Sequence, residues 1–121
     1  MGKHDVANIE TLPALAQNEK EAIREFAQLL RRQFGTVVRD IILFGSKATG
    51  AGQKDSDIDI LIVLTSLSWA IKKTISDMAA QENIKYSVLI STVRYDAKTW
   101  DSAVIRSSPF GHTVREQGLW L

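Results

Sequence analysis

The 121-residue sequence contains no cysteine and only two prolines, and its apolar runs are short. Without cysteine, the chain has no disulfide, no thiolate nucleophile and no cysteine-ligated zinc. The longest apolar run, 58–64, is interrupted by an aspartate and is far shorter than the ~20 residues that cross a bilayer. No basic segment followed by an apolar one opens the chain, so we expect no secretory signal and no membrane contact. These absences predict a cytoplasmic protein.

An excess of charge of one sign is also missing. Fifteen basic residues balance fourteen acidic ones, and the formal net charge is +1. This balance gives no global attraction for nucleic acid. Apolar residues make up 45% and charged residues 24%, which is typical of a globular protein. The length predicts one domain, which we place at residues 18–121 after an N-terminal arm at residues 1–17.

Hydrophobic spacing predicts alternating helices and strands. Asn18, followed three residues later by Glu21, resembles a helix start, and a helical apolar stripe predicts a helix over 18–34. Runs rich in β-branched residues predict three strands, at 37–44, 58–64 and 84–91. Further helices are predicted after the serines at 66–68, over 96–105, and from Pro109 to a stop at Gly118. The order predicts an α+β fold, a small mixed β-sheet with helices packed on one side.

The segment LFGSKATGAGQKDSDIDILIVL contains the residues with the clearest chemical meaning. Asp57 and Asp59 are two positions apart on a strand, so their side chains point to the same face. Two carboxylates this close repel each other unless a positive charge lies between them. Mg²⁺ prefers carboxylate oxygens and completes its shell with water and substrate phosphates. The pair therefore predicts a magnesium site of the kind used in phosphoryl or nucleotidyl transfer.

The loop between the two strands has the features of a phosphate-binding turn. Gly45 allows the backbone to turn and to approach a ligand closely. If Ser46 opens a helical turn, free backbone amides and its hydroxyl would face an anion there. Lys47 and Lys54 would add positive charge. No Gly-Lys-Ser/Thr sequence closes the stretch, which excludes a Walker-type loop.

The same residues resemble the signature of the DNA polymerase β-like nucleotidyltransferase superfamily, in its minimal, stand-alone branch. That signature is Gly45-Ser46, a loop of about ten residues, and Asp57-x-Asp59 after a serine. The closing segment SSPFGHTVREQGLWL is similar to the end of a minimal subgroup. The resemblance implies that Gly45, Ser46 and Lys47 bind a nucleoside triphosphate and that Asp57 and Asp59 hold Mg²⁺. A nucleoside monophosphate, expected to be AMP, would then pass to an acceptor hydroxyl.

The resemblance also implies a partner. Minimal members pair as antitoxins with a small helical protein of the HEPN type, and some adenylylate a tyrosine on it. Trp120 is hard to bury in a small domain, which adds an interface between copies of this chain as a further expectation. A scaffold that binds no nucleotide is the plainest alternative.

One departure from the family pattern concerns a third carboxylate, which active members carry on the next strand. Aligning the predicted strand NIKYSVLIS with that pattern places Ser87 there. A serine is neither a strong Mg²⁺ ligand nor a general base at neutral pH. Two hypotheses follow: a nucleotidyltransferase whose base comes from elsewhere, or a catalytically impaired, antitoxin-like binding subunit.

Overall fold

The computed structural model describes residues 9–51 and 56–121 of the chain. A short 3₁₀ turn, η1 (Ile9–Thr11), and helix α1 (Gln17–Phe34) open the fold, and a second 3₁₀ turn, η2 (Gly35–Val37), leads into the sheet. The remaining elements, in chain order, are β1 (Val38–Phe44), α2 (Ser46–Thr49), β2 (Ile58–Leu64), α3 (Trp69–Tyr86), β3 (Ile90–Asp96), α4 (Ala97–Trp100), α5 (Ala103–Ser107), α6 (Pro109–Gln117) and β4 (Leu119–Trp120). Within the described residues, no helix is both long enough and apolar enough to span a membrane.

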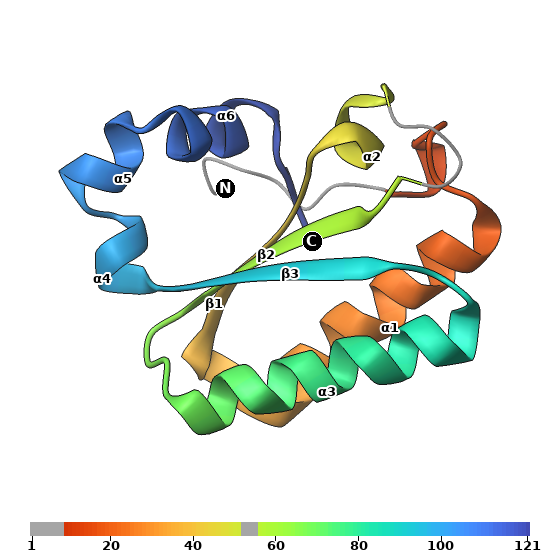
Figure 1. Ribbon diagram of the computed structural model, residues 1–121, viewed down its shortest axis with the longest axis horizontal. Coiled ribbons are helices and arrows are strands. Elements are labelled where there is room, and N and C mark those ends of the chain that lie inside the picture. The colour runs from red at the N-terminus through yellow and green to blue at the C-terminus, as the bar shows by residue number, and fades with distance from the viewer. Residues whose placement is uncertain (1–8, 52–55) are drawn as a thin grey trace.

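The four strands form one mixed sheet in the order β3-β2-β1-β4. β1 is antiparallel to both β2 and β4, whereas β2 and β3 are parallel. β2 is apolar on both faces and occupies a central position, as its sequence predicts. The sheet confirms the predicted α+β class (Figure 1). The sequence did not predict β4, which is only two residues long.

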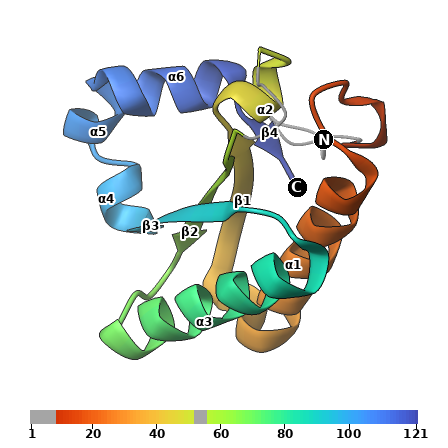
Figure 2. The same cartoon turned by 45° about the vertical axis from the view of Figure 1, so that its right-hand side comes forward.

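Helices cover both faces of the sheet rather than one. The two long helices, α1 and α3, lie together on one face, where Ile41, Leu43, Ile60 and Ile62 join the larger core. On the other face, Ile42, Leu61 and Val63 pack against Trp100 of α4 and Val114 of α6. Figure 2 shows α4, α5 and α6 on the side of the sheet opposite α1 and α3. The predicted one-sided arrangement therefore holds for the long helices, and the three short C-terminal helices add a second layer.

α1 begins one residue before the predicted start, and a different pair of residues caps it. Ala16 is the N-cap, and Glu19, not Glu21, returns to it by accepting a hydrogen bond from the Ala16 backbone N–H at 2.9 Å. Asn18 instead donates to the Tyr86 carbonyl oxygen at 2.9 Å, which ties the start of α1 to the end of α3. Gly35, with φ of 56°, ends the helix as predicted.

The predicted strand over 84–91 is wrong. α3 continues through Tyr86, whose hydroxyl donates to Glu25 of α1, and β3 begins only at Ile90. Ser87 is the C-cap of α3, with φ of 56° in the left-handed region. The helix persists because its last turn packs against α1, a tertiary contact that a local pattern of apolar residues does not reveal.

The C-terminal third agrees better with its sequence. Ser108 caps α6, Pro109 occupies its first turn and Gly118 ends it, as predicted. The helix predicted over 96–105 is instead two short helices, because Ser102 caps a new one after α4 ends at Trp100. Trp120, expected at an interface between copies, lies half-buried in β4 and packs within the chain against the second core.

Candidate active site

The turn after β1 has the backbone conformation that its glycine predicts. Gly45 has φ of 77° and is the N-cap of α2, a single helical turn that Ser46 opens. Its carbonyl oxygen accepts hydrogen bonds from Ala48 and Thr49 at 3.1 and 3.3 Å. Ser46 is partly exposed at the start of this turn. Lys54, the other predicted source of positive charge, lies outside the described residues.

The two aspartates lie at the end of β2 next to this turn. Asp59 is paired with Phe44 across the antiparallel ladder, so its backbone is beside the last residue before Gly45. Ile58 points into the core with α1 and α3, which places Asp59 on the opposite face of the sheet. Asp57 precedes the strand and is exposed. Register and sequence spacing thus bring the carboxylates and the glycine turn to one edge.

Gly45 and Asp59 are in direct contact. A Cβ added to Gly45 would overlap Oδ2 of Asp59 and lie 3.5 Å from its Cβ. Position 45 therefore excludes a side chain for two reasons, its positive φ and the carboxylate packed on its Cα. The contact fixes the Asp59 carboxylate against the turn.

The electrostatics of the pair favour a cation. Burial raises the pKa of Asp59 above its ordinary value, and the negative charge of Asp57 raises it further. A cation beside both carboxylates would relieve that repulsion. Among residues 9–51 and 56–121, no group of three or more His, Cys, Asp or Glu side chains could hold a metal. The donor set fits an ion such as Mg²⁺, which needs few protein carboxylates when phosphates and water complete its shell.

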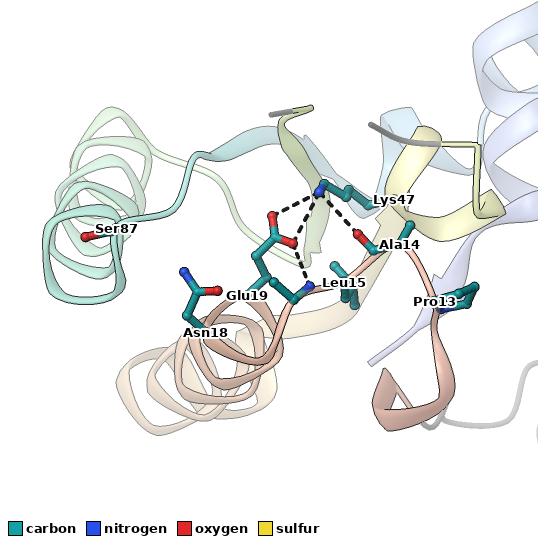
Figure 3. A pocket seen from close by; sticks show the side chains of 8 residues that line it. Pro13, Ala14, Leu15, Asn18, Glu19, Lys47 and Ser87 are labelled. Carbon is teal, nitrogen blue, oxygen red and sulfur yellow. Dashed lines mark hydrogen bonds and ion pairs between the residues drawn. The ribbon is translucent and has the colours of Figure 1, made fainter. Parts of the chain in front are cut away.

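Lys47 has a partner inside the protein. Its ammonium lies 3.1 Å from Oε2 of Glu19 and donates to the Ala14 carbonyl oxygen at 3.2 Å. The side chain is buried, with 1% of its surface exposed. A cavity of about 360 Å³ adjoins this ion pair, lined by the lead-in to α1, Asn18 and Ser87 (Figure 3). Lys47 thus connects the turn after Gly45 to the start of α1.

The structure places a different serine beside the aspartates from the one that the alignment predicted. Ser87 caps α3, and Ser91 is the residue paired with Asp59 in the parallel ladder. Residues opposite each other share a face, so Ser91 occupies the place nearest to Asp59 on β3. Glu82, the acid that precedes Ser87 most closely in the sequence, is buried on α3, and its pKa is raised by burial and by Glu25 of α1. Because α1 and α3 cover the opposite face, Glu82 is not beside the aspartates.

Two further residues on the carboxylate face were not predicted from the sequence. The rings of Phe44 and Phe110 meet edge to face, with centroids 5.5 Å apart. Phe110 belongs to α6 and is 36% exposed, so an aromatic surface begins one residue from Gly45. The contact joins segments far apart in the chain, and nothing in either local sequence predicts it.

Comparison with known proteins gives the site a context. Residues 23–115 match the family described as nucleotidyltransferase domain. The chain belongs to this family. MJ0604 of Methanocaldococcus jannaschii, provisionally named a protein adenylyltransferase, is 33% identical over 102 residues, which are 84% of this chain and 95% of the relative. MJ0141 of the same organism carries the same provisional name and is 34% identical over 80 residues, 62% of this chain and 77% of the relative.

Solved structures share the fold of this nucleotidyltransferase-domain protein. A chain of a toxin–antitoxin complex with AMP-PNP superposes with a TM-score of 0.53 at 21% identity, over 79% of this chain and 69% of that one. A second match is a chain of a complex between a tri-AMPylated Shewanella oneidensis HEPN toxin and an MNT antitoxin. It superposes with a TM-score of 0.51 at 19% identity, over 84% of this chain and 69% of that one. At these identities the likeness shows the fold alone.

Proposed function

We propose that the protein transfers AMP from ATP to a hydroxyl group on a protein acceptor, with Mg²⁺ held by Asp57 and Asp59. The observation that carries this proposal is the packing of the Asp59 carboxylate on the Cα of Gly45. That contact brings one carboxylate of the pair against a glycine–serine turn, which supports a site for a metal–triphosphate complex. The provisional names of the two M. jannaschii relatives support a protein acceptor.

Each residue of the turn has a part in this reaction. Gly45 lets the β- and γ-phosphates approach the backbone, and the Ser46 hydroxyl donates a hydrogen bond to a phosphate oxygen. Asp59 is held in place by Gly45, so its carboxylate is oriented before substrate binds. Lys47 stabilises the turn from the protein interior through its ion pair with Glu19 of α1. When bound, Mg²⁺ would neutralise negative charge on the phosphates and on the pyrophosphate that leaves.

The acceptor that we propose is a small helical protein of the HEPN type, encoded next to this chain. The support is the shared fold with antitoxin chains solved in complex with HEPN toxins, one of them AMPylated. ATP and free Mg²⁺ are abundant in the cytoplasm, which is where we place the reaction.

The test is label transfer from [α-³²P]ATP to the neighbouring gene product in the presence of Mg²⁺. We expect labelled partner with the wild-type protein and none with Asp57→Asn or Asp59→Asn. Asp77→Asn removes the same charge from an exposed site on α3 and should leave transfer unchanged. Transfer that persists in Asp59→Asn would overturn the proposal.

A second candidate is a binding subunit that neutralises its partner by contact alone. The observation in its favour is that two residues beside the aspartates have no carboxylate: Ser91 of β3, which is paired with Asp59, and Leu89, which precedes β3 and whose carbonyl oxygen accepts from the Ile58 N–H. In this case the partner is neutralised equally well by wild type and by Asp57→Asn, and no label is transferred. Failure to bind ATP with Mg²⁺ at all would leave only a scaffold role.

A further inference from the structure

A second polar cavity lies on the face of the sheet that the short C-terminal helices cover. Its volume is about 330 Å³, and its lining includes Arg39, Trp100, Asp101, Arg106 and Arg115. These residues come from β1, α4, α5, α6 and the connection after α4. Three guanidinium groups thus meet around one cavity, although they are far apart in the sequence. With Asp40, the cavity has two carboxylates against three guanidiniums.

Arg39 is paired with both carboxylates of the cavity. Its terminal nitrogens donate to both oxygens of Asp101, at 2.6 and 3.1 Å, and its Nε donates to Asp40 at 3.0 Å. This fork-to-fork geometry is the strongest form of an arginine–carboxylate pair. Arg39 offsets one of the two negative charges, so the three guanidiniums and two carboxylates leave the cavity with an excess of one positive charge.

The guanidinium of Arg115 is held in place by Trp100, but not all of its N–H groups have a hydrogen-bond partner among the described residues. Its guanidinium stacks 4.3 Å above the Trp100 ring, and its Nη2 donates to the Trp100 carbonyl oxygen at 2.9 Å. The nearest carboxylate oxygen, on Asp101, is 3.7 Å from the same nitrogen. The other terminal nitrogen, Nη1, is buried and has no hydrogen-bond partner in the described part of the chain. The Arg115 side chain is 20% exposed, so part of it remains open to the cavity that it lines.

Arg106 adds a third cation at the mouth of the cavity. Its Nε donates to the Asp101 backbone carbonyl at 3.1 Å, which directs the guanidinium toward the cavity without using its terminal nitrogens in that contact. Burial, followed by the charge of Arg106, lowers the pKa of Arg115. The two guanidiniums thus repel each other, and an anion between them would remove the repulsion.

We propose that this cavity is a phosphate-binding site, separate from the carboxylate pair, in which the guanidinium groups of Arg106 and Arg115 donate to one phosphate group. A tetrahedral anion accepts hydrogen bonds from two guanidiniums at an angle, and the cavity volume admits a phosphate with its water. The site lies near the start of β1, whereas Gly45 follows the other end of that strand. Five residues of strand separate Arg39 from Phe44, roughly 16 Å. The site therefore does not depend on the proposed transferase function.

The test uses the tryptophans of the cavity as reporters. The protein has three tryptophans, and Trp69 is 76% exposed on α3, so Trp69→Phe leaves only Trp100 and Trp120 to fluoresce. Inorganic phosphate is titrated into this variant without Mg²⁺, at ionic strength held constant with chloride. We expect a saturable change, half-complete in the millimolar range or below. AMP and acetate are titrated into the same variant in parallel. AMP tests whether a phosphate monoester binds, and acetate tests whether a planar oxyanion binds.

Variants that each remove one positive charge show whether the phosphate binds in this cavity. Arg106→Gln should raise the half-saturating phosphate concentration at least fivefold, whereas Arg32→Gln, which removes one exposed charge from α1 on the other face, should change it less than twofold. Arg115→Lys keeps the charge, loses the planar guanidinium and should weaken binding as well, provided that its thermal transition shows a folded protein. Asp59→Asn should bind phosphate like wild type. A non-saturable response, equal effects of Arg106→Gln and Arg32→Gln, or equal affinity for acetate would overturn the proposal.

Discussion

The ammonium of Lys47 lies 3.1 Å from the carboxylate of Glu19, and this ion pair joins the turn after β1 to the first turn of α1. Side-chain exposures of 1% for Lys47 and 11% for Glu19 place the pair inside the protein. Removing one partner of such a pair leaves an uncompensated buried charge, which is far more costly than breaking an exposed pair. The turn that presents Ser46 is therefore anchored from inside the fold.

We predict that Lys47→Met lowers the free energy of unfolding by about 3 kcal/mol. Adding Glu19→Gln should recover part of that loss, because glutamine removes the unpaired charge and its oxygen still accepts from Ala16. Urea denaturation of both single variants and the double variant gives the coupling energy. The control is Lys73→Met in the exposed pair with Asp77, expected to cost less than about 1 kcal/mol. Equal losses at positions 47 and 73 would contradict this account.

The contact between Gly45 and Asp59 predicts a cost for Gly45→Ala beyond backbone strain. Alanine would meet the left-handed φ of 77° and also overlap the Asp59 carboxylate. Gly35→Ala is the matched control, since its φ is 56° and nothing lies within 4 Å of the added Cβ. We expect about 1 kcal/mol of destabilisation at Gly35 and clearly more at Gly45. In an Asp59→Ala background the excess at Gly45 should disappear, and an undiminished excess would show that Asp59 is not its cause.

The carboxyl pair of Glu25 and Glu82 predicts a dependence of stability on pH. Burial, together with the hydrogen bond and the charge of Glu25 on the facing helix, raises the pKa of Glu82 from 4.5 to about 7, and the charge of Lys85 opposes this rise. Between pH 4.5 and 7 the unfolded chain releases a proton that folded Glu82 retains, so stability falls as the pH rises through this window and levels off above it.

Glu82→Gln removes this titration and keeps a hydrogen-bonding side chain of the same size. The difference in free energy of unfolding between this variant and wild type should grow in favour of the variant from pH 4.5 to pH 7 and change no further at pH 8. Chemical denaturation at each pH measures it. Glu25→Gln removes the second and third causes of the raised pKa, so the fall should become shallower in that variant. A stability difference between wild type and Glu82→Gln that is the same at pH 5 and pH 8 would exclude Glu82 as the titrating group.

Local sequence was sufficient to predict the structure where a residue type strongly favours one backbone conformation or one degree of burial. Pro109 and Gly118 bound α6 correctly, and a run that is apolar on both faces identified β2 as a central strand. The turn at Gly45 and the helical turn that opens at Ser46 were both expected from the glycine–serine sequence, and both are present. At these positions, steric and burial constraints act within a few residues of the chain.

Prediction failed where a contact with a distant element decides the conformation. Residues 84–86 are apolar enough for a strand, but Tyr86 and Lys85 bind Glu25 of α1, and α3 extends to meet it. Lys47 shows the same limit in the candidate site. Its charge was evident from the sequence, but its direction depends on Glu19, which reaches the turn only in the folded chain.

The register of β2 and β3 moves the expected place of a third carboxylate to Ser91. Ser91 is paired with Asp59, whereas Ser87 caps α3 and lies outside the ladder. A carboxylate at position 91 would share the face of Asp59 and come within reach of the same cation. We therefore predict that Ser91→Asp raises label transfer to the partner, or creates it if the wild type has none. Ser87→Asp should give no gain.

A stability measurement tests the same geometry without activity. Three carboxylates on one face repel one another, so Ser91→Asp should melt at a lower temperature than wild type in the absence of metal. Mg²⁺ should restore more of the melting temperature in this variant than in wild type, because the added ligand makes binding to the folded state tighter. Asp59→Asn combined with Ser91→Asp should lose most of that Mg²⁺ response. If Mg²⁺ raised the melting temperature of Ser87→Asp and Ser91→Asp equally, position 91 would not face the aspartate pair.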